Sequence, residues 1–282
     1  MKRVLTATVL IVAVVFLLIR GQLWMITLAA ALVATLASWE YRQLANTGAA
    51  DSRSGIPIWW MLLGIAAVFV VVFYRPSDTI AVVSALGVLL FVRCGFRSPL
   101  DRVLPVTSAG VFGLLYVAWP LTLLPLLWEQ EGGAALLLLL MVCVWAGDIA
   151  ALYAGRAIGG PKLAPRLSPG KTWAGSVASI AASVLGAWLL VVIGDLLTAR
   201  GNAVLHLAAP LWQVLVLAAI LNIAAQLGDL LESAIKRGAG VKDSGTLLPG
   251  HGGILDRIDA LLLAAPVLWF TLLIRDAIIA RF

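Results

Sequence analysis

The chain has 282 residues, of which 62% are hydrophobic and only 12% are charged. A soluble domain of this length would carry about 25% charged residues. Apolar runs of about 20 residues recur along the whole length, and each is long enough to cross about 30 Å of hydrocarbon as a helix. The composition therefore excludes a soluble protein. The net charge of +6 suits a membrane surface with anionic lipid, so no nucleic-acid partner is expected.

Nine candidate membrane spans predict an all-α, polytopic integral membrane protein. They cover residues 4–19, 22–39, 57–74, 79–96, 106–128, 134–154, 173–194, 211–235 and 258–274. Pro120 and Pro125 are expected to kink the fifth span or to end it early. The N-terminal helices, residues 1–130, carry no recognisable motif. Residues 131–282 are expected to form the catalytic region of one continuous membrane domain.

Basic residues are unevenly divided between the two faces that these spans define. With a cytoplasmic N-terminus, five of the twenty lysines and arginines fall on the outer face and the remainder on the cytoplasmic face. The outer five are Arg20, Arg75, Arg200, Arg275 and Arg281. Positive charge accumulates on the cytoplasmic side of membrane proteins. We therefore expect an inner-membrane protein whose 155–172 and 236–257 loops both face the cytoplasm.

The eighth span carries a polar stripe. Its members, spaced 4, 3, 4 and 3 positions apart, are Asn222, Gln226, Asp229, Ser233 and Lys236. On a helix this spacing places them on one face, which must contact protein or water because lipid satisfies no polar group. Hydrogen bonds between helices would explain Asn222 and Gln226. For Asp229, with Glu232 beside it, we favour a metal ion over a plain salt bridge.

The loop after this span is suited to phosphate. Glycines at 238, 240, 245, 250, 252 and 253 allow close backbone approach, and lysine and arginine side chains lie among them. A glycine-rich loop alone is also typical of an ordinary turn. His251 is a candidate general base, although an ionised phosphate nucleophile needs none, and a capping or packing role is an alternative.

Four acidic residues are expected around one rim. Asp256 and Asp259 lie three positions apart where the ninth span begins, and they would follow Asp229 and Glu232 of the preceding span. Capping of a helix N-terminus would explain one of them. Carboxylates in such number repel one another unless a cation bridges them, and oxygen ligands of this kind suit Mg²⁺ shared with substrate phosphates.

The 155–172 loop carries a second polar group. Ser168, Lys171 and Thr172 immediately precede an apolar span, and small hydroxyls with a lysine at a helix start favour anion binding. A capped helix start with charges at the membrane interface is the simpler alternative. Asp148 and Tyr153 end the span before this loop.

Together these residues resemble the phosphatidate cytidylyltransferase (CDP-diacylglycerol synthase) family. The family signature is matched by Ser233, Lys236, Arg237, Lys242, Asp243, Gly245, Leu248, Pro249, His251, Gly252, Gly253, Asp256, Arg257 and Asp259. Familial elements upstream are Asp148, Tyr153, Gly155, Arg156, the Ser168–Gly175 block and Gln226 with Gly228 and Asp229. The resemblance covers residues 148–259. One departure is Ala174, where the family commonly has Glu.

The resemblance implies that CTP and phosphatidic acid give CDP-diacylglycerol and pyrophosphate, with Mg²⁺ bound at Asp229 and Asp256. Lys236 and Asp259 join these two as catalytic candidates. The substrate-binding candidates are Ser168, Lys171, Thr172, Ser233, Arg237, Lys242, Asp243, His251 and Arg257. The expected partners are CTP, phosphatidic acid and membrane lipids, and a homodimer is left open.

Two alternatives remain at this point. Another CTP-using membrane enzyme, such as a CDP-archaeol-type synthase or a lipid kinase, would share the phosphate chemistry. A transporter would carry charges near the middle of the membrane and paired interrupted helices in two halves. Here the charges gather at helix ends, which disfavours the transporter.

Overall fold

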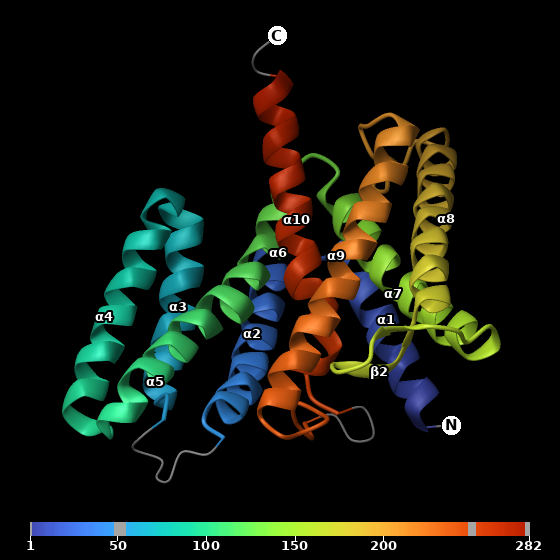
Figure 1. Ribbon diagram of the computed structural model, residues 1–282. Coiled ribbons are helices and arrows are strands. Elements are labelled where there is room, and N and C mark those ends of the chain that lie inside the picture. Colours follow the sequence, from blue (N-terminus) through green and yellow to red (C-terminus); the bar gives the residue numbers. More distant parts are fainter. Residues whose placement is uncertain (1, 48–54, 248–251, 280–282) are drawn as a thin grey trace. The chain divides into compact units, whose positions relative to one another are not determined.

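The computed structural model describes residues 2–47, 55–247 and 252–279 (Figure 1). His251, Leu248 and Pro249 of the signature lie outside these residues. The elements in chain order are α1 (Lys2–Arg20), α2 (Leu23–Ala45), α3 (Ile58–Tyr74), η2 (Pro76–Asp78), α4 (Thr79–Arg97), α5 (Leu100–Gly113), η3 (Leu114–Ala118), α6 (Trp119–Glu129), α7 (Gly133–Ala157), β1 (Lys162–Ala164), β2 (Ser168–Thr172), α8 (Trp173–Thr198), α9 (Leu211–Gly238) and α10 (Leu255–Ile279).

The all-α, polytopic fold is confirmed, and the protein is an integral membrane protein. Within the described residues, seven helices are long and apolar enough to cross a bilayer, and Ile11–Arg20 and Ile58–Tyr74 are shorter apolar helices. Each of the nine predicted spans falls on one of these helices. The second helix continues six residues past the predicted end, to Ala45, which places Glu40 inside it.

The fifth span does not end early at its prolines. Helix α5 runs through the π-helical segment η3 into α6, and Pro125 lies inside α6. A proline at 120 removes the N–H that would bond the carbonyl four residues earlier. The π-helical turn at Leu114–Ala118 directly precedes that position and is the local irregularity of this helix.

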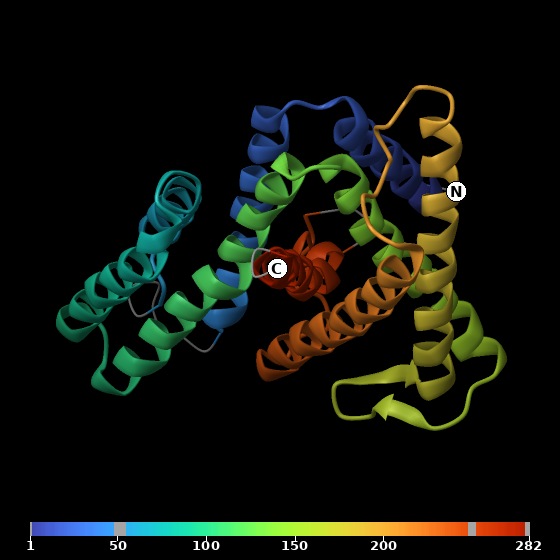
Figure 2. The ribbon, with the colours of Figure 1, turned by 90° about the horizontal axis from the view of Figure 1, so that it is seen from above.

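A short antiparallel hairpin interrupts the helices. Strand β1 pairs with β2 in a register that places Lys162 opposite Thr172 and Ala164 opposite Ser168. We had interpreted this segment as a loop leading into a helix start. Figure 2 shows the hairpin at one end of α8, which begins directly after β2.

The chain forms two compact units that interleave along the sequence. The first unit comprises Met1–Ile26, Leu123–Ala234 and Asp259–Phe282, and the second comprises Thr27–Thr122 and Ile235–Ile258.

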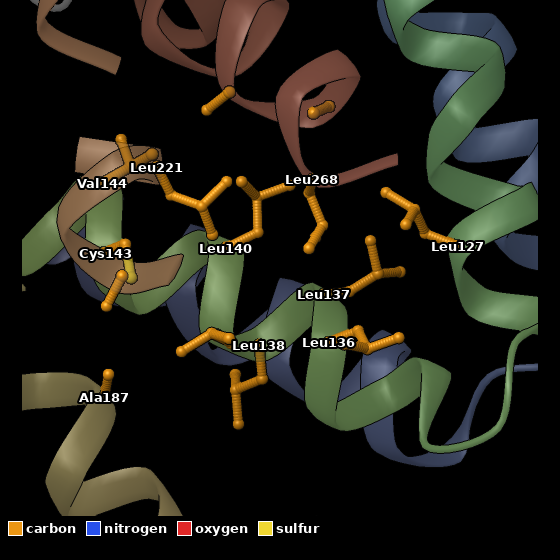
Figure 3. Packing of buried hydrophobic residues seen from close by; sticks show 14 of the residues in the cluster. Leu127, Leu136, Leu137, Leu138, Leu140, Cys143, Val144, Ala187, Leu221 and Leu268 are labelled. Carbon is orange, nitrogen blue, oxygen red and sulfur yellow. The ribbon is translucent and has the colours of Figure 1, made fainter. Parts of the chain in front are cut away.

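Leucines of α7 form the core of the first unit. Leu137 and Leu140 are almost fully buried, and they pack with Leu127 of α6, Leu221 of α9 and Leu268 of α10 (Figure 3). Because side chains from three other helices pack on α7, this helix positions α9 and α10 within the unit.

Glycine allows α7, α8 and α9 to approach one another closely. A Cβ on Gly147 would meet Nδ2 of Asn222 and the hydroxyl oxygens of Ser179 and Ser183 within 3.0 Å. Those polar groups are hydrogen bonded: Asn222 Nδ2 donates to Ser179 Oγ at 3.0 Å, and Ser183 Oγ donates to the Cys143 carbonyl at 2.6 Å. The three helices are therefore joined by hydrogen bonds that can form only if residue 147 has no side chain.

The second unit has a tight contact between its helices. Trp60 of α3 is fully buried and donates its indole N–H to the Leu86 carbonyl of α4 at 2.9 Å. Tyr41 of α2 donates its hydroxyl to the Ala109 carbonyl of α5 at 2.8 Å. The second bond holds α2, and with it Glu40, against the rest of this unit.

We expect Gly147→Val to destabilise the protein by about 1–3 kcal/mol, because the side chain overpacks the contact and displaces buried hydrogen bonds. Gly95→Val in α4 is the matched control, since a Cβ there meets nothing within 4 Å. Thermal unfolding in detergent measures both variants. An equal loss in the two would mean that the β-branched side chain alone, and not the close approach, causes the effect.

Candidate active site

The first unit gathers acidic side chains beside one lysine. Asp229 of α9 accepts an ion-pair contact from Lys171 of β2, with Nζ 2.6 Å from Oδ2. The two side chains are 32% and 25% exposed, so the pair is partly shielded from water. Asp259 of α10 lies within electrostatic range of Asp229, Glu232 and Asp148. Three helices thus contribute the carboxylates that interact electrostatically with Asp259. Asp229, Glu232 and Asp259 belong to the predicted four, whereas Asp256 lies in the second unit and Asp148 was not among them.

The hairpin explains how Lys171 reaches Asp229. Thr172 ends β2 and caps α8, because its Oγ1 accepts a hydrogen bond from the Gly175 N–H at 3.1 Å. Gly175 has no room for a side chain, since a Cβ would meet the Ala151 carbonyl oxygen. The capping alternative is therefore correct for Thr172, and Ser168 lies at the far end of β2, away from the cap.

The polar stripe of α9 faces protein, as predicted. Asn222 and Ser233 are buried and Asp229 is half-buried, whereas Ile223, Leu227 and Leu231 on the other face are exposed. These exposed apolar side chains suit contact with lipid.

Hydrogen bonds fix the rotation of α9. Gln226 Nε2 donates to Asn222 Oδ1 at 2.7 Å, and Ser176 Oγ of α8 donates to Gln226 Oε1 at 2.5 Å. The predicted hydrogen bonding between helices is confirmed for both Asn222 and Gln226. With this face held toward α8, Asp229 one turn further along points toward the cluster.

The second unit holds a buried ion pair between the two helix ends that flank the signature loop. Lys236 Nζ donates to Asp256 Oδ1 at 2.6 Å, and their side chains are only 11% and 8% exposed. The other carboxylate oxygen of Asp256 accepts N–H groups from Ser244 at 3.0 Å and from Gly253 at 2.9 Å. Both oxygens of Asp256 are therefore fixed in position before any substrate binds.

Glu40 is a residue that sequence reasoning missed. It lies in α2, is 1% exposed, and accepts hydrogen bonds from Ser244 Oγ and from the backbone N–H groups of Ile254 and Leu255. We had assigned only hydrophobicity to the N-terminal spans and had ended the second span at residue 39. An acidic residue inside a membrane helix is the signal that would have found it.

Four of the remaining predicted residues lie on the outside of the same segments, and Ser233 is buried. Arg237, Lys242, Asp243 and Arg257 are exposed, and Arg237 Nη1 donates to the Val241 carbonyl at 3.1 Å. Ser233 is buried and its Oγ lies 3.5 Å from Asp229 Oδ1. The described residues thus bring Asp229 together with Lys171, and Asp256 with Lys236, while the basic loop residues stay accessible to a ligand.

The donor set fits a divalent ion that brings other ligands with it. Within the residues that the structure describes, no group of three or more His, Cys, Asp or Glu side chains is arranged to hold a metal ion by itself. Mg²⁺ is usually bound through one or two carboxylates together with substrate phosphates and water. Asp229 and Asp256 each have this chemistry, since each offers carboxylate oxygens beside a single lysine.

A family model described as the cytidylyltransferase family matches residues 1–275. The chain belongs to the cytidylyltransferase family. The match includes the first 130 residues, where we found no motif, and so includes Glu40.

Relatives were found in several bacteria. A phosphatidate cytidylyltransferase of Brucella suis is 46% identical over 162 residues, which is 57% of this chain and 55% of that protein, so the match spans about half of that relative's length. A phosphatidate cytidylyltransferase of Pseudomonas aeruginosa is 34% identical over 94% of both chains. The uncharacterised protein YnbB of Escherichia coli is 33% identical over 90% of this chain and 81% of its own length.

The Lys171–Asp229 pair gives a test of the acidic cluster that needs no enzyme assay. Lys171→Met removes the positive charge that offsets Asp229 and its acidic neighbours, so we expect Tm in EDTA to fall by a few degrees. Millimolar Mg²⁺ should restore it, because a bound cation replaces the lost charge.

Lys162→Met, an exposed lysine on the neighbouring strand, is the control and should leave Tm unchanged in both conditions. If Mg²⁺ shifted Tm of Lys171→Met no more than that of the unmodified protein, the cluster would not bind a divalent ion.

Proposed function

We propose that the protein transfers the cytidylyl group of CTP to phosphatidic acid, with CDP-diacylglycerol and pyrophosphate as products. The similarity to the phosphatidate cytidylyltransferase of Pseudomonas aeruginosa over 94% of both chains is the observation that carries the proposal. The buried Lys236–Asp256 pair, which joins the two helix ends beside the glycine-rich loop, supports it, because it offers charged groups next to the segment where phosphate binding is expected.

The proposed reaction is an in-line displacement at phosphorus. An oxygen of the lipid phosphate attacks the α-phosphorus of CTP, the bond between the α-phosphorus and its bridging oxygen breaks, and pyrophosphate leaves with the electron pair. The attacking phosphate is already ionised near neutral pH, so no general base is required. The main obstacle is electrostatic, since both reactants are anions that must approach within bonding distance.

Basic side chains would lower this repulsion. Lys171 and Lys236 would contact phosphate oxygens from partly buried positions, where charge interactions are stronger than in water. The exposed residues Arg237, Lys242 and Arg257 would hold pyrophosphate or the lipid head group.

The acidic residues would position cations. Asp229 and Asp256 are the proposed Mg²⁺ ligands, and an ion bound at either residue would neutralise phosphate charge and favour in-line geometry. Asp243 and Asp259 would orient these ligands or the basic residues around them. Of the other candidates, Ser168, Thr172 and Ser233 would act through their hydroxyls, and His251 stays a prediction from sequence.

The membrane helices would keep the substrate's acyl chains in the bilayer. Moving a chain into water costs about 0.8 kcal/mol per CH₂ group, so the reaction must occur where the head group meets the membrane surface. We place this surface at the cytoplasmic face of the inner membrane, where CTP is available and where the basic loops are expected from the distribution of positive residues.

The decisive experiment incubates the purified protein with Mg²⁺, phosphatidic acid and CTP labelled at either the α- or the γ-phosphorus. The proposal expects label in the lipid product only from α-labelled CTP, because the α-phosphorus is transferred to the lipid. The γ-phosphorus should leave in pyrophosphate. Transfer of the γ-label would indicate a CTP-dependent lipid kinase. A preference for an archaeal-type ether lipid phosphate over phosphatidic acid would indicate a CDP-archaeol-type synthase.

Asp256→Asn should lower the rate of CDP-lipid formation by about 100-fold or more, because an amide is a poor Mg²⁺ ligand and a poor partner for Lys236. The variant should remain folded in detergent, as judged by size-exclusion chromatography and Tm. Asp101→Asn, an exposed acidic residue in the first turn of α5, is the control and should keep full activity. Near-normal activity of Asp256→Asn with unchanged Mg²⁺ dependence would contradict the assignment.

A further inference from the structure

We propose that Glu40 is a positioning residue, which holds the loop of residues 244–255 so that the Asp256 carboxylate is presented in one fixed orientation. The proposal rests on the proposed function for the role of Asp256. It assigns a part in the reaction to the N-terminal helices, to which the signature motif gives none. Glu40 itself does not contact the substrate in this proposal; it acts through the loop.

The contacts of Glu40 reach across more than 200 positions of sequence. Its Oε2 accepts hydrogen bonds from Ser244 Oγ at 2.9 Å and from the Leu255 N–H at 2.9 Å, and its Oε1 accepts one from the Ile254 N–H at 3.0 Å. The side chain thus binds both ends of the loop. Two of these donors are backbone N–H groups at the start of α10, which have no partner within the helix. A helix N-terminus favours a nearby negative charge.

Ser244 connects Glu40 to Asp256. Its hydroxyl donates to Glu40 and accepts a hydrogen bond from the Asp256 N–H at 3.3 Å, while its own N–H donates to Asp256 Oδ2 at 3.0 Å. A single serine therefore ties the backbone and the side chain of Asp256 to the buried carboxylate. Displacing Glu40 would release Ser244, and with it one of the hydrogen bonds that orient Oδ2.

Two glycines of the signature leave room for the Glu40 side chain. A Cβ on Gly245 would meet Oε1 and Cδ of Glu40, and a Cβ on Gly253 would meet Oε2 of Glu40 and Oγ of Ser244, in each case closer than 3.0 Å. The loop backbone is thus shaped around this carboxylate. This close packing is an observation separate from the hydrogen bonds, and it indicates that the loop backbone is folded against the Glu40 side chain.

The chemistry of the site requires an acceptor. Within the described residues, the three groups that hydrogen bond to Glu40 all act as donors, and a carboxylate is the side chain that accepts at both terminal atoms. Glutamine has nearly the same volume but turns one of these atoms into an NH₂ group, which would face N–H or O–H donors. Because the site is almost fully buried, water would not replace the lost hydrogen bonds.

The test compares Glu40→Gln, Glu40→Asp and the control Ser38→Ala. Ser38 lies in the same helix, is fully buried, and its Oγ makes no hydrogen bond in the described part of the chain. We expect Glu40→Gln to lower kcat about 10- to 100-fold, as for other residues that orient metal ligands, and to raise the Mg²⁺ concentration needed for half-maximal rate. KM for CTP should change less than about threefold, since the basic residues that bind phosphate stay in place.

Glu40→Asp keeps two acceptor oxygens on a shorter side chain, so its kcat should be at least about fivefold higher than that of Glu40→Gln. Ser38→Ala should stay within about twofold of the unmodified protein. A purely structural role predicts a different result: lower Tm and less folded protein, but an unchanged kcat per folded molecule and an unchanged Mg²⁺ requirement. That result would overturn the proposal.

Amide hydrogen exchange gives a readout that does not depend on the reaction. The N–H groups of Ile254 and Leu255 donate directly to Glu40, so they should exchange at least about tenfold faster in Glu40→Gln and at the normal rate in Ser38→Ala. Unchanged protection would overturn the proposal even if activity fell. If the unmodified protein made no CDP-diacylglycerol, the proposed function would fail, whereas faster exchange in Glu40→Gln would still establish that Glu40 holds the loop.

Discussion

A carboxylate buried at the end of an apolar helix must be surrounded by donors or cations, and this constraint organises the charged part of the molecule. Asp256 meets it with one lysine and two backbone N–H groups. Glu40 meets it with one hydroxyl and two N–H groups. In the first unit Asp229 meets it with Lys171. Since an unpaired buried carboxylate would cost several kcal/mol, the positions of these donors determine the paths of the loop and the hairpin.

The same constraint accounts for residues that carry no charge. Gly228 of α9 has no room for a side chain because the Asp259 carbonyl and Ala260 of α10 pack against it, which brings Asp259 close to Asp229. The hydrogen bonds of Asn222 and Gln226 keep the polar face of α9 turned away from lipid. Small residues and amides are thus used to aim carboxylates, and their own hydrogen bonds contribute to joining the helices.

Hydrophobic periodicity predicted the features that depend on a single helix. The nine apolar runs gave the helices, and the 4-3-4-3 spacing of the α9 stripe predicted its buried face, because both depend only on local geometry. The hairpin at 162–172 was missed because β1 has only three residues and β2 contains proline and glycine, so neither strand shows an alternating pattern. Glu40 was missed for a different reason: its partners lie more than 200 positions away, and contacts of that kind leave no periodic signal. The signature loop was recognised, but the residue that shapes it was not.

The two lysine–carboxylate pairs have a consequence for the proposed reaction. Lys171 and Lys236 each lie 2.6 Å from a carboxylate that is a proposed metal ligand, so each acidic group is neutralised before substrate arrives. In the proposed reaction, a triphosphate bound to Mg²⁺ would supply, at either pair, a cation for the carboxylate and anionic oxygens for the lysine. Exchange of partners would then keep every charge paired throughout binding, which matters where solvent screening is weak. Such an exchange would require that the lysine moves while the carboxylate stays fixed. In the second unit, the hydrogen bonds from Ser244 and Gly253, with Glu40 bound to Ser244, would keep Asp256 in place.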